Sequence, residues 1–283
     1  MRFLRYGPVG KETPVVMNSN DECFVLPASI GDIDGEFWEN DGPSAVQKLL
    51  DAGDLESFSP GDLRIGAPIA KPEKLICIGL NYIDHAKEMD LPIPEEPIVF
   101  MKAPNAMIGP HDDVYRPRGA TKMDWEIELA VIIGKRARYL DSPDDAPGVM
   151  AGFSLSNDVT ERAFMLERGG TWVKGKSCET FNPLGPWVAT PDEIPNPQDI
   201  GMRLSVNNIS HQDSSTKNMI FPINHLIWYL SQFMVLEPGD VVNTGSPSGV
   251  SNGHDDVPFL EAGDVIHAEI DGLGTHEYTI VQA

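Results

Sequence analysis

Three carboxylates stand at the start of the most apolar segment of the chain, "KMDWEIELAVIIGK" at residues 122–135. In a strand, Glu126 and Glu128 would share one face, about 6.6 Å apart along the chain, and Asp124 could join them. Two such charges in a partly buried site repel each other by roughly 2.5 kcal/mol at an effective dielectric constant near 20. Exposure to water on a solvated strand face, a raised pKa or a bound cation would relieve that repulsion.

A second acidic group follows another apolar strand, in "SLSNDVTER" at residues 154–162. Asp158 stands there between Asn157 and Thr160. Oxygen ligands without cysteine or paired histidine suit Mg²⁺, Mn²⁺ or Ca²⁺ rather than zinc. Carboxylates of the two segments could therefore hold a divalent cation together, with octahedral positions left for water and substrate, while the solvated strand face stays an alternative.

A histidine and a glutamate three residues apart could form an acid–base pair. His85 and Glu88 lie in "NYIDHAKEM", where one or two helical turns would place both on the same face. A carboxylate beside an imidazole fixes its tautomer and supports its protonated form, as a general base requires. An ordinary ion pair on a surface helix would give the same spacing.

Cations and hydroxyls complete the set of candidates. Lys174 and Lys176 are separated by one glycine in "WVKGKSCETF", although most lysines are solvated surface charges. Arg162 could hold a substrate carboxylate by two hydrogen bonds, or merely neutralise Glu161. The segment "NTGSPSG" offers the hydroxyls of Thr244 and Ser246 to a ligand, although plain turn chemistry also explains it. The remaining histidines lack ligand spacing and are interpreted as structural: His111, His211, His225, His254, His267 and His276.

Charge and cysteine content restrict the function classes. The formal net charge is −22, from 43 acidic against 21 basic residues, and a surface so negative repels nucleic acids and anionic membranes. No segment has the ~18 consecutive apolar residues that a membrane span needs, and the N-terminus has no signal-peptide core. The three cysteines lack metal-ligand spacing and indicate a reducing compartment, so we expect a cytoplasmic protein.

The elements that must position these residues are mostly strands. Residues 1–70 are expected to form a small N-terminal α/β unit, with a helix at residues 42–53 that ends at Gly53. Residues 59–74 are rich in proline and glycine and are expected to be the connection. Residues 71–283 predict several strands, one or two helical turns near residues 81–89 and a helix at residues 223–236. We therefore predict an α+β, strand-rich fold with a large, rolled, mostly antiparallel or mixed sheet.

Several segments together resemble the fumarylacetoacetate hydrolase family over roughly residues 70–283. The N-terminal unit is also similar to the small domain of bacterial two-domain members. Within the family, the chain is most similar to bacterial 2,4-diketo-3-deoxy-sugar-acid hydrolases and acylpyruvases. The segments that carry the resemblance are, in order, "CIGLNYIDHAKE", "EPIVFMK", "DWEIELAVIIGK", "AGFSLSNDVTER", "KGKSCETFNPLGPWV" and "LEPGDVVNTGSPSGV".

The resemblance implies a mixed β-roll catalytic domain at residues 71–283, a homodimer, and Mg²⁺ or Mn²⁺ as the cofactor. It places the metal carboxylates on Glu126, Glu128 and Asp158. It places a His–Glu pair, carried by a lid, on His85 and Glu88.

The resemblance also implies contacts to substrate. The family's active-site lysine corresponds to Lys176 and its substrate-binding arginine to Arg162. Ser246 stands where the family has a threonine, and Tyr82 and Thr244 are further candidates for substrate binding. Met165 departs from the pattern, because many members carry there a glutamine that bonds a substrate oxygen.

The implied reaction is metal-dependent hydrolysis of the C–C bond of a 2,4-diketo acid, giving pyruvate and a carboxylic acid. Decarboxylation of oxaloacetate or keto–enol isomerisation on the same metal site is an alternative. A protein that binds a keto acid without catalysis is an alternative of another class. His85 and Lys176 favour catalysis over a purely structural cation, which would need neither.

Overall fold

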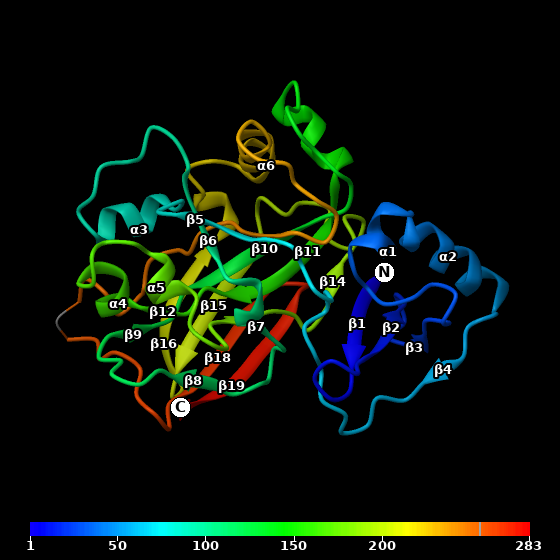
Figure 1. Cartoon of the computed structure of the whole chain (residues 1–283), viewed down its shortest axis with the longest axis horizontal. Coiled ribbons are helices and arrows are strands. Elements are labelled where there is room, and N and C mark those ends of the chain that lie inside the picture. Colours follow the sequence, from blue (N-terminus) through cyan, green and yellow to red (C-terminus); the bar gives the residue numbers. More distant parts are fainter. Residues whose placement is uncertain (255) are drawn as a thin grey trace.

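The computed structural model describes residues 1–254 and 256–283, and strands dominate it. One sheet of ten strands runs through the molecule, and a second sheet of five strands packs beside it (Figure 1). The first sheet has, in spatial order, β4 (Ser57–Phe58), β3 (Cys23–Val25), β2 (Thr13–Met17), β1 (Arg2–Tyr6), β14 (Val188–Ala189), β11 (Met150–Asn157), β10 (Ile127–Ile133), β17 (Val241–Asn243), β5 (Leu75–Gly79) and β6 (Ile98–Lys102). The second has β16 (Ile209–Ser215), β15 (Gly201–Val206), β18 (Val265–Ile270), β19 (Gly274–Gln282) and β8 (Val114–Arg116).

Two short strand pairs and a few helices complete the fold. The pairs are β9 (Met123–Asp124) with β12 (Thr160–Glu161), and β7 (Met107–Ile108) with β13 (Asn182–Pro183). The α-helices are α1 (Gly35–Glu39), α2 (Gly42–Ala52), α3 (Ile83–Glu88), α4 (Arg162–Leu166), α5 (Val173–Lys176) and α6 (Ile223–Ser231), with 3₁₀ turns η1 (Pro104–Ala106), η2 (Pro143–Gly148) and η3 (Thr216–Asn218). Most strand pairs are antiparallel, whereas β17·β5, β13·β7 and β19·β8 are parallel. The predicted α+β fold with a mixed sheet is confirmed.

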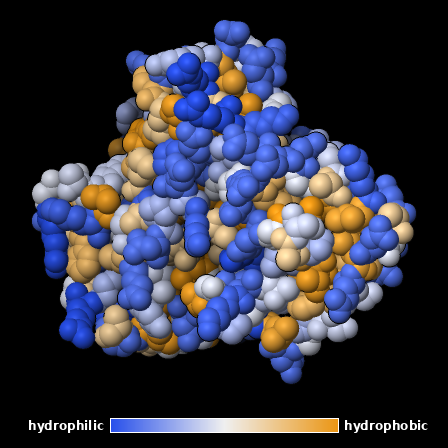
Figure 2. Space-filling view, turned by 45° about the vertical axis from the view of Figure 1, so that its right-hand side comes forward, coloured by the Kyte–Doolittle hydropathy of each residue, from blue (hydrophilic) through white to orange (hydrophobic). Residues whose placement is uncertain are grey.

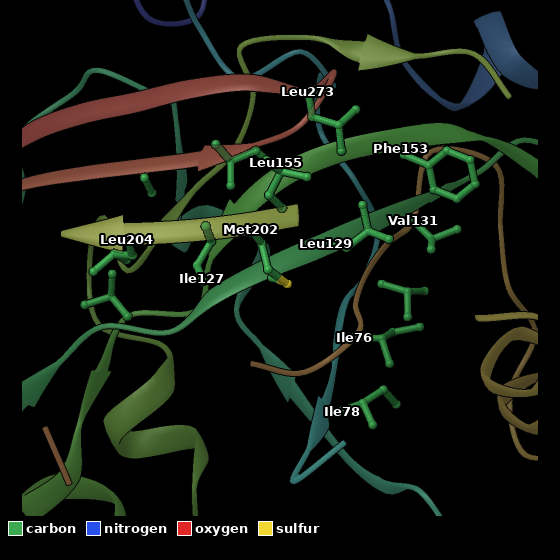
Figure 3. Close-up of a cluster of buried hydrophobic side chains, with 14 of the residues drawn as sticks. Ile76, Ile78, Ile127, Leu129, Val131, Phe153, Leu155, Met202, Leu204 and Leu273 are labelled. Carbon is green, nitrogen blue, oxygen red and sulfur yellow. The ribbon is translucent and has the colours of Figure 1, made fainter. Parts of the chain in front are cut away.

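Strand β10 is buried on both faces. It lies inside the large sheet between β11 and β17, the second sheet packs on one face, and the apolar cluster that contains Trp38 packs on the other. Its odd-numbered side chains, Ile127, Leu129 and Val131, belong to the main apolar core together with Met202 of β15 (Figure 3). Its even-numbered Ala130 and Ile132 belong to a second apolar cluster. A strand covered on both faces must be apolar throughout, so any charge on it requires a specific partner.

The first 70 residues continue the large sheet. Strand β1 pairs antiparallel with β14, with Phe3 opposite Val188. Phe3 also shares an apolar cluster with Trp38 of α1 and Ile132 of β10. The N-terminal segment and the rest of the chain therefore share one sheet and part of one core, while the division at residue 70 into two domains stays a prediction.

Helix boundaries follow local signals in one case and tertiary contacts in another. Helix α2 ends at Gly53, which adopts the left-handed conformation (φ 71°) that glycine favours, as predicted. Helix α6 ends at Ser231, earlier than the predicted residue 236. Leu236 instead forms an antiparallel bridge with Ala137, so a β contact replaces the last helical turn.

The face of the molecule that Figure 2 shows is mostly hydrophilic, with smaller apolar patches between polar side chains. Within the part of the chain that the structure describes, every helix is too short or too polar to cross a membrane.

Candidate active site

The register of β10 and β11 brings the acidic residues of two distant segments together. The strands are antiparallel, with Ile127 opposite Asn157 and Glu128 opposite Ser156. Asp158 therefore follows the end of β11 beside the start of β10, where its N–H donates to the carbonyl of Glu126 at 2.8 Å. Sheet pairing alone thus converts a separation of about thirty residues into direct contact.

Glu126, Glu128 and Asp158 form a compact carboxylate triad. One oxygen atom from each lies within 4.8 Å of the others. The three residues are 6%, 1% and 0% exposed, respectively. The alternative of a solvated strand face is therefore wrong, because the carboxylates are buried against Lys102, Lys176 and the backbone N–H of Gly245. The repulsion between these carboxylates has to be relieved by positive charge or by protonation.

Two lysines carry part of that positive charge. The ammonium of Lys176 bridges Glu126 and Asp158 and lies 2.5 Å from Oδ2 of Asp158. Although burial favours the neutral amine, Asp158 and Glu126 raise the pKa of Lys176 above its ordinary value. Lys102, at the end of β6, places its Nζ 2.5 Å from the other oxygen of Asp158. Lys176 is therefore a fixed cation rather than a base near neutral pH.

Glu128 is the member of the triad without a cationic partner among the described residues. Its Oε2 accepts one hydrogen bond, from the N–H of Gly245 at 2.7 Å. Burial, followed by repulsion from Asp158 and Glu126, raises the pKa of Glu128 well above its ordinary value. A divalent cation at the triad would supply the charge that Glu128 lacks, and the all-oxygen donor set suits Mg²⁺ or Mn²⁺. The residues present therefore fit such an ion.

Arg162 and Asp124 form a separate pair next to the triad. Nε of Arg162 donates to Oδ2 of Asp124 at 2.9 Å, and its Nη2 donates to Oε1 of Glu126 at 2.6 Å. The carboxylate of Asp124 also accepts the N–H groups of Ser251 and Asn252. Asp124 thus holds Arg162 and a loop instead of joining the triad.

One alternative from the sequence was that Arg162 neutralises Glu161. The structure shows that the two side chains do not pair. The side chain of Glu161 accepts the N–H groups of Ala163, Lys122 and Thr121, so it caps α4 and fixes the segment before β9. Arg162 is therefore free to neutralise the buried acids Asp124 and Glu126.

Helix α3 carries the predicted His–Glu pair. Nδ1 of His85 lies 2.9 Å from Oε2 of Glu88. The other oxygen of Glu88 accepts the N–H of Gly249 at 2.7 Å and lies 2.8 Å from Nε2 of His254. Burial opposes ionisation of Glu88, but the hydrogen bonds from His85, His254 and Gly249 lower its pKa. Glu88 is thus held as a carboxylate that orients His85.

The hydroxyl candidates occupy different positions. Ser246 lines the site, and its Oγ accepts a hydrogen bond from Nε2 of Gln212 at 2.9 Å. The hydroxyl of Thr244 donates to the carbonyl of Leu129 at 2.8 Å. The hydroxyl of Tyr82 lies 3.2 Å from the sulfur of Met202 in the apolar core. The hydroxyls of Thr244 and Tyr82 therefore contact groups of the surrounding fold, and neither residue lines the cavity.

A cavity of about 320 Å³ joins these groups. The triad, His85 and Lys176 all line it. Arg162, Met165 and Ser246 line it as well. The predicted base, the predicted cation site and the predicted active-site lysine thus face a single space.

Three residues at the site were not singled out from the sequence, namely Lys102, Gln212 and His254. Lys102 is 2% exposed and donates to the carbonyls of Val159 and Phe181 besides Asp158. Its only signal in the sequence is a lysine at the end of an apolar strand. The hydrogen bonds of Lys102, Gln212 and His254 join residues that are 34 to 166 positions apart in the chain. Local sequence patterns do not predict such contacts.

Comparison with known proteins gives consistent matches over the whole chain. A family model described as fumarylacetoacetate (FAA) hydrolase C-terminal matches residues 74–281. A protein of Burkholderia ambifaria, provisionally named a hydrolase, is 42% identical over 275 residues, 97% of this chain and 96% of the relative.

Solved structures agree with these matches. The fumarylacetoacetate hydrolase of Exiguobacterium antarcticum is 30% identical with a TM-score of 0.84, and all of both chains is covered. The maleylpyruvate hydrolase of Sphingobium sp. SYK-6 is 27% identical with a TM-score of 0.82, again over all of both chains. The 5-carboxymethyl-2-hydroxymuconate delta-isomerase of Mycobacterium smegmatis is 29% identical with a TM-score of 0.77, over 100% of this chain and 99% of that one. Similar proteins thus include both hydrolases and an isomerase.

Proposed function

The chain belongs to the fumarylacetoacetate hydrolase family, and on that premise we propose that it hydrolyses the C–C bond of an acylpyruvate, a 2,4-diketo acid. Water adds to the distal carbonyl, and the products are pyruvate and a carboxylic acid. One observation carries this proposal: the carboxylate triad, His85 and Lys176 line the same cavity. Non-catalytic binding of a keto acid would not need the histidine and its buried glutamate.

Glu126, Glu128 and Asp158 would hold the cofactor, which we propose to be Mg²⁺ or Mn²⁺. When bound, such an ion acts as a Lewis acid on the 2-oxo acid end of the substrate and stabilises the negative charge that develops on the pyruvate part. The triad's two structural cations, Lys102 and Lys176, both contact Asp158. Lys176 holds the carboxylates of Glu126 and Asp158 together, and Lys102 fixes Asp158, before a ligand arrives.

His85 is the proposed general base. Its Nδ1 faces Glu88 at 2.9 Å, which leaves Nε2 to take a proton from water. An imidazole is suited to that transfer near neutral pH. The hydroxide so formed attacks the distal carbonyl carbon, and the same imidazolium can return the proton to the leaving carbon.

Lys176 and Arg162 supply positive charge that does not titrate near neutral pH. Buried carboxylates raise the pKa of both side chains above their ordinary values. We assign to Lys176 the stabilisation of the oxyanion that forms at the attacked carbonyl. Nε and Nη2 of Arg162 are engaged by Asp124 and Glu126, so Nη1 is the group that we assign to a substrate oxygen, with Ser246 as a second contact.

The test is a steady-state assay of acylpyruvates with Mg²⁺ or Mn²⁺, with pyruvate release as the readout. We expect His85→Ala to reduce hydrolysis by at least about 100-fold, as loss of a general base does. His267→Ala is the matched control, because His267 is exposed on β18. Wild-type protein that releases no pyruvate from any acylpyruvate would contradict the proposal.

A second candidate is isomerisation or decarboxylation of a keto acid at the same site. The similarity to a 5-carboxymethyl-2-hydroxymuconate delta-isomerase favours it. Decarboxylation of oxaloacetate requires no attacking water, so His85→Ala should spare it more than hydrolysis. Equal loss of both activities would mean that His85 has another role.

We also propose that the protein is a cytoplasmic homodimer. Large apolar side chains such as Phe233 and Tyr139 are 67% and 69% exposed. They lie near each other, since the N–H of Tyr139 bonds the carbonyl of Ser231 at the end of α6. Contiguous exposed apolar side chains are typical of subunit contacts. Analytical ultracentrifugation of the wild type and of Phe233→Glu tests this assignment.

A further inference from the structure

The side chains that line the active-site cavity form a charged set and an apolar set, called here the charged half and the apolar half of its lining. The charged half consists of the triad, Lys176, Arg162 and His85, and the polar side chains of Ser246 and Asn252 also line the cavity. The apolar half offers no charge and no strong hydrogen-bonding group besides one indole N–H, and consists of Met89, Leu91, Ile98, Phe100, Met165, Leu166 and Trp172. A substrate that fills the cavity therefore meets two different chemical environments.

Phe100 of β6 marks the boundary between the halves. Its ring lies 5.0 Å from Nζ of Lys176 on one side. On the other side it packs edge-to-face against Trp172, with ring centroids 5.0 Å apart and an interplanar angle of 66°. Because Lys176 also contacts the triad, the apolar half begins one ring away from the proposed reaction centre.

A glycine allows the apolar wall to form. A Cβ at Gly79 of β5 would lie 2.8 Å from a ring carbon of Trp172. The missing side chain at Gly79 lets the indole of Trp172 approach β5 this closely. Met165 completes the wall from α4, and it is 5% exposed.

Among the described residues, Lys176 and Arg162 are the only lysine and arginine that line the cavity, and both are held at the carboxylates. Lys176 contacts Glu126 and Asp158, and Arg162 contacts Asp124 and Glu126, with only its Nη1 left for a substrate oxygen. Lys174 is exposed, and its Nζ lies 2.5 Å from the carbonyl of Arg168, outside the cavity. A carboxylate buried against apolar side chains without a cation is strongly disfavoured.

The rim of the apolar half is open to solvent. Leu91, Ile98 and Leu166 are 48%, 36% and 51% exposed, although each lines the cavity. Leu91 follows α3, and its N–H bonds the carbonyl of Ala86, so it moves with the helix that carries His85. Apolar side chains left exposed around a cavity gain most from an apolar ligand.

We propose that this half is a subsite for an apolar acyl group, and that the substrate is an alkyl or aryl acylpyruvate without a second carboxylate. This inference rests on the proposed function and adds the class of the distal group. The acyl chain would lie between Phe100, Trp172 and Met165, with its carbonyl toward Lys176. Diketo acids that end in a second carboxylate would be poor substrates.

A matched pair of compounds tests the subsite directly. Succinylpyruvate ends in a carboxylate, and 4-methylpentanoylpyruvate replaces that carboxylate with an isopropyl group of similar shape. We expect kcat/KM to favour the isopropyl compound by at least about tenfold, the scale on which apolar pockets discriminate. A kcat/KM equal or higher for succinylpyruvate would overturn the subsite while leaving the proposed reaction intact.

Calorimetric titration of the His85→Ala protein with the same two compounds measures binding to the subsite with turnover suppressed. If the wild-type protein cleaves neither compound, the ratio of dissociation constants still tests the subsite separately from the proposed reaction. Tighter binding of the isopropyl compound supports the apolar subsite. Equal or tighter binding of succinylpyruvate contradicts it.

A charge placed in the wall should shift the preference. Leu166→Lys puts an ammonium at the edge of the apolar half, at a position exposed enough to tolerate it. We expect the ratio of kcat/KM values, or of dissociation constants, to shift at least about tenfold toward succinylpyruvate. Ile209→Lys is the matched control, because Ile209 is 63% exposed on β16 and does not line the cavity. If folded Leu166→Lys protein shows the same preference between the two compounds as Ile209→Lys, the result would argue against the subsite.

Discussion

Nε2 of His254 lies 2.8 Å from Oε1 of Glu88, 166 residues apart in the chain. The other oxygen of Glu88 lies 2.9 Å from His85, so a loop residue supports the proposed base through one carboxylate. The N–H of Gly249 donates to the same Glu88 oxygen as His254. The loop that carries Gly249 and His254 therefore fastens α3 over the cavity.

This contact predicts a pH-dependent lid. The hydrogen bond to Glu88 raises the pKa of His254 above its ordinary value. The ion pair is therefore fully present below the ordinary histidine pKa and is lost as pH rises through the raised value. At the acid end it is lost as pH falls through the lowered pKa of Glu88. Protection of the amides of residues 83–91, taken relative to the intrinsic exchange rate at each pH, should be greatest between these two limits.

The variant His254→Ala tests the assignment. We expect faster exchange of residues 83–91 near neutral pH and a KM raised severalfold. The loss of protection at basic pH that we expect in the wild type should disappear in this variant. His267→Ala, on an exposed stretch of β18, should leave both measurements unchanged. An unchanged pH profile of exchange in His254→Ala would show that another group controls the lid.

Lys102 should be essential for stability. Its ammonium is buried and donates to Asp158 and to two carbonyls, at 2.5 to 3.1 Å. Removing one partner of a buried ion pair leaves the other charge uncompensated, which costs about 3 kcal/mol or more. We therefore expect Lys102→Met to lower the free energy of unfolding by about 3 kcal/mol, measured by urea denaturation.

Lys122 provides the comparison for Lys102. It forms an exposed ion pair with Glu167, in which the two side chains are 44% and 57% exposed. Such pairs contribute less than about 1 kcal/mol. Equal losses for Lys122→Met and Lys102→Met would contradict the buried role of Lys102.

His276 should limit stability in mild acid. It is fully buried, and burial lowers its pKa to about 3 although it lies 3.0 Å from the carbonyl of Gly185. In the unfolded chain His276 binds a proton near pH 6.5, whereas in the folded chain it stays neutral down to about pH 3. The free energy of unfolding therefore falls as pH drops from about 6.5 toward 3. His276 alone should contribute about 1 kcal/mol per pH unit to that fall.

His276→Gln keeps a donor for the Gly185 carbonyl and removes the titration. Between pH 4 and 6 the free energy of unfolding of this variant should change less steeply with pH than that of the wild type. The difference in slope should correspond to about one proton fewer taken up on unfolding. The exposed His267→Gln should keep the wild-type slope. Parallel slopes for the wild type and His276→Gln would exclude His276 as the responsible group.

The sequence predicted the members of the site better than their contacts. Glu126, Glu128 and Asp158 could be grouped because spacing on a strand and the polar turn after another strand are local patterns. The solvated-face alternative could not be excluded from the sequence, because burial of β10 depends on strands that pair with it from residues 150–157 and 241–243. Asp124 binds Arg162 instead of joining the triad. The spacing of the acidic residues in the sequence does not reveal this contact.

Fold prediction failed where tertiary contacts override local preference. The end of α2 was predictable because Gly53 is a local signal, whereas the end of α6 depends on the bridge between Leu236 and Ala137. The pairing of β1 with β14 joins residues 2–3 to residues 188–189. No pattern within the first 70 residues indicates that their sheet continues into the rest of the chain.

The central claim is that the triad binds a divalent cation, and Glu128 is the position that tests it most cleanly. Removing Glu126 or Asp158 would take an ion-pair partner from the buried Lys176 and destabilise the fold. A loss of metal binding could then not be told from a loss of folded protein. Glu128→Gln breaks no ion pair among the described residues. The deciding measurement is titration of metal-free protein with Mn²⁺, followed by electron paramagnetic resonance.

The account predicts one Mn²⁺ bound per wild-type chain, with binding weakened at least about tenfold in folded Glu128→Gln. Identical Mn²⁺ affinity in the two proteins, or no binding to the wild type, would contradict it.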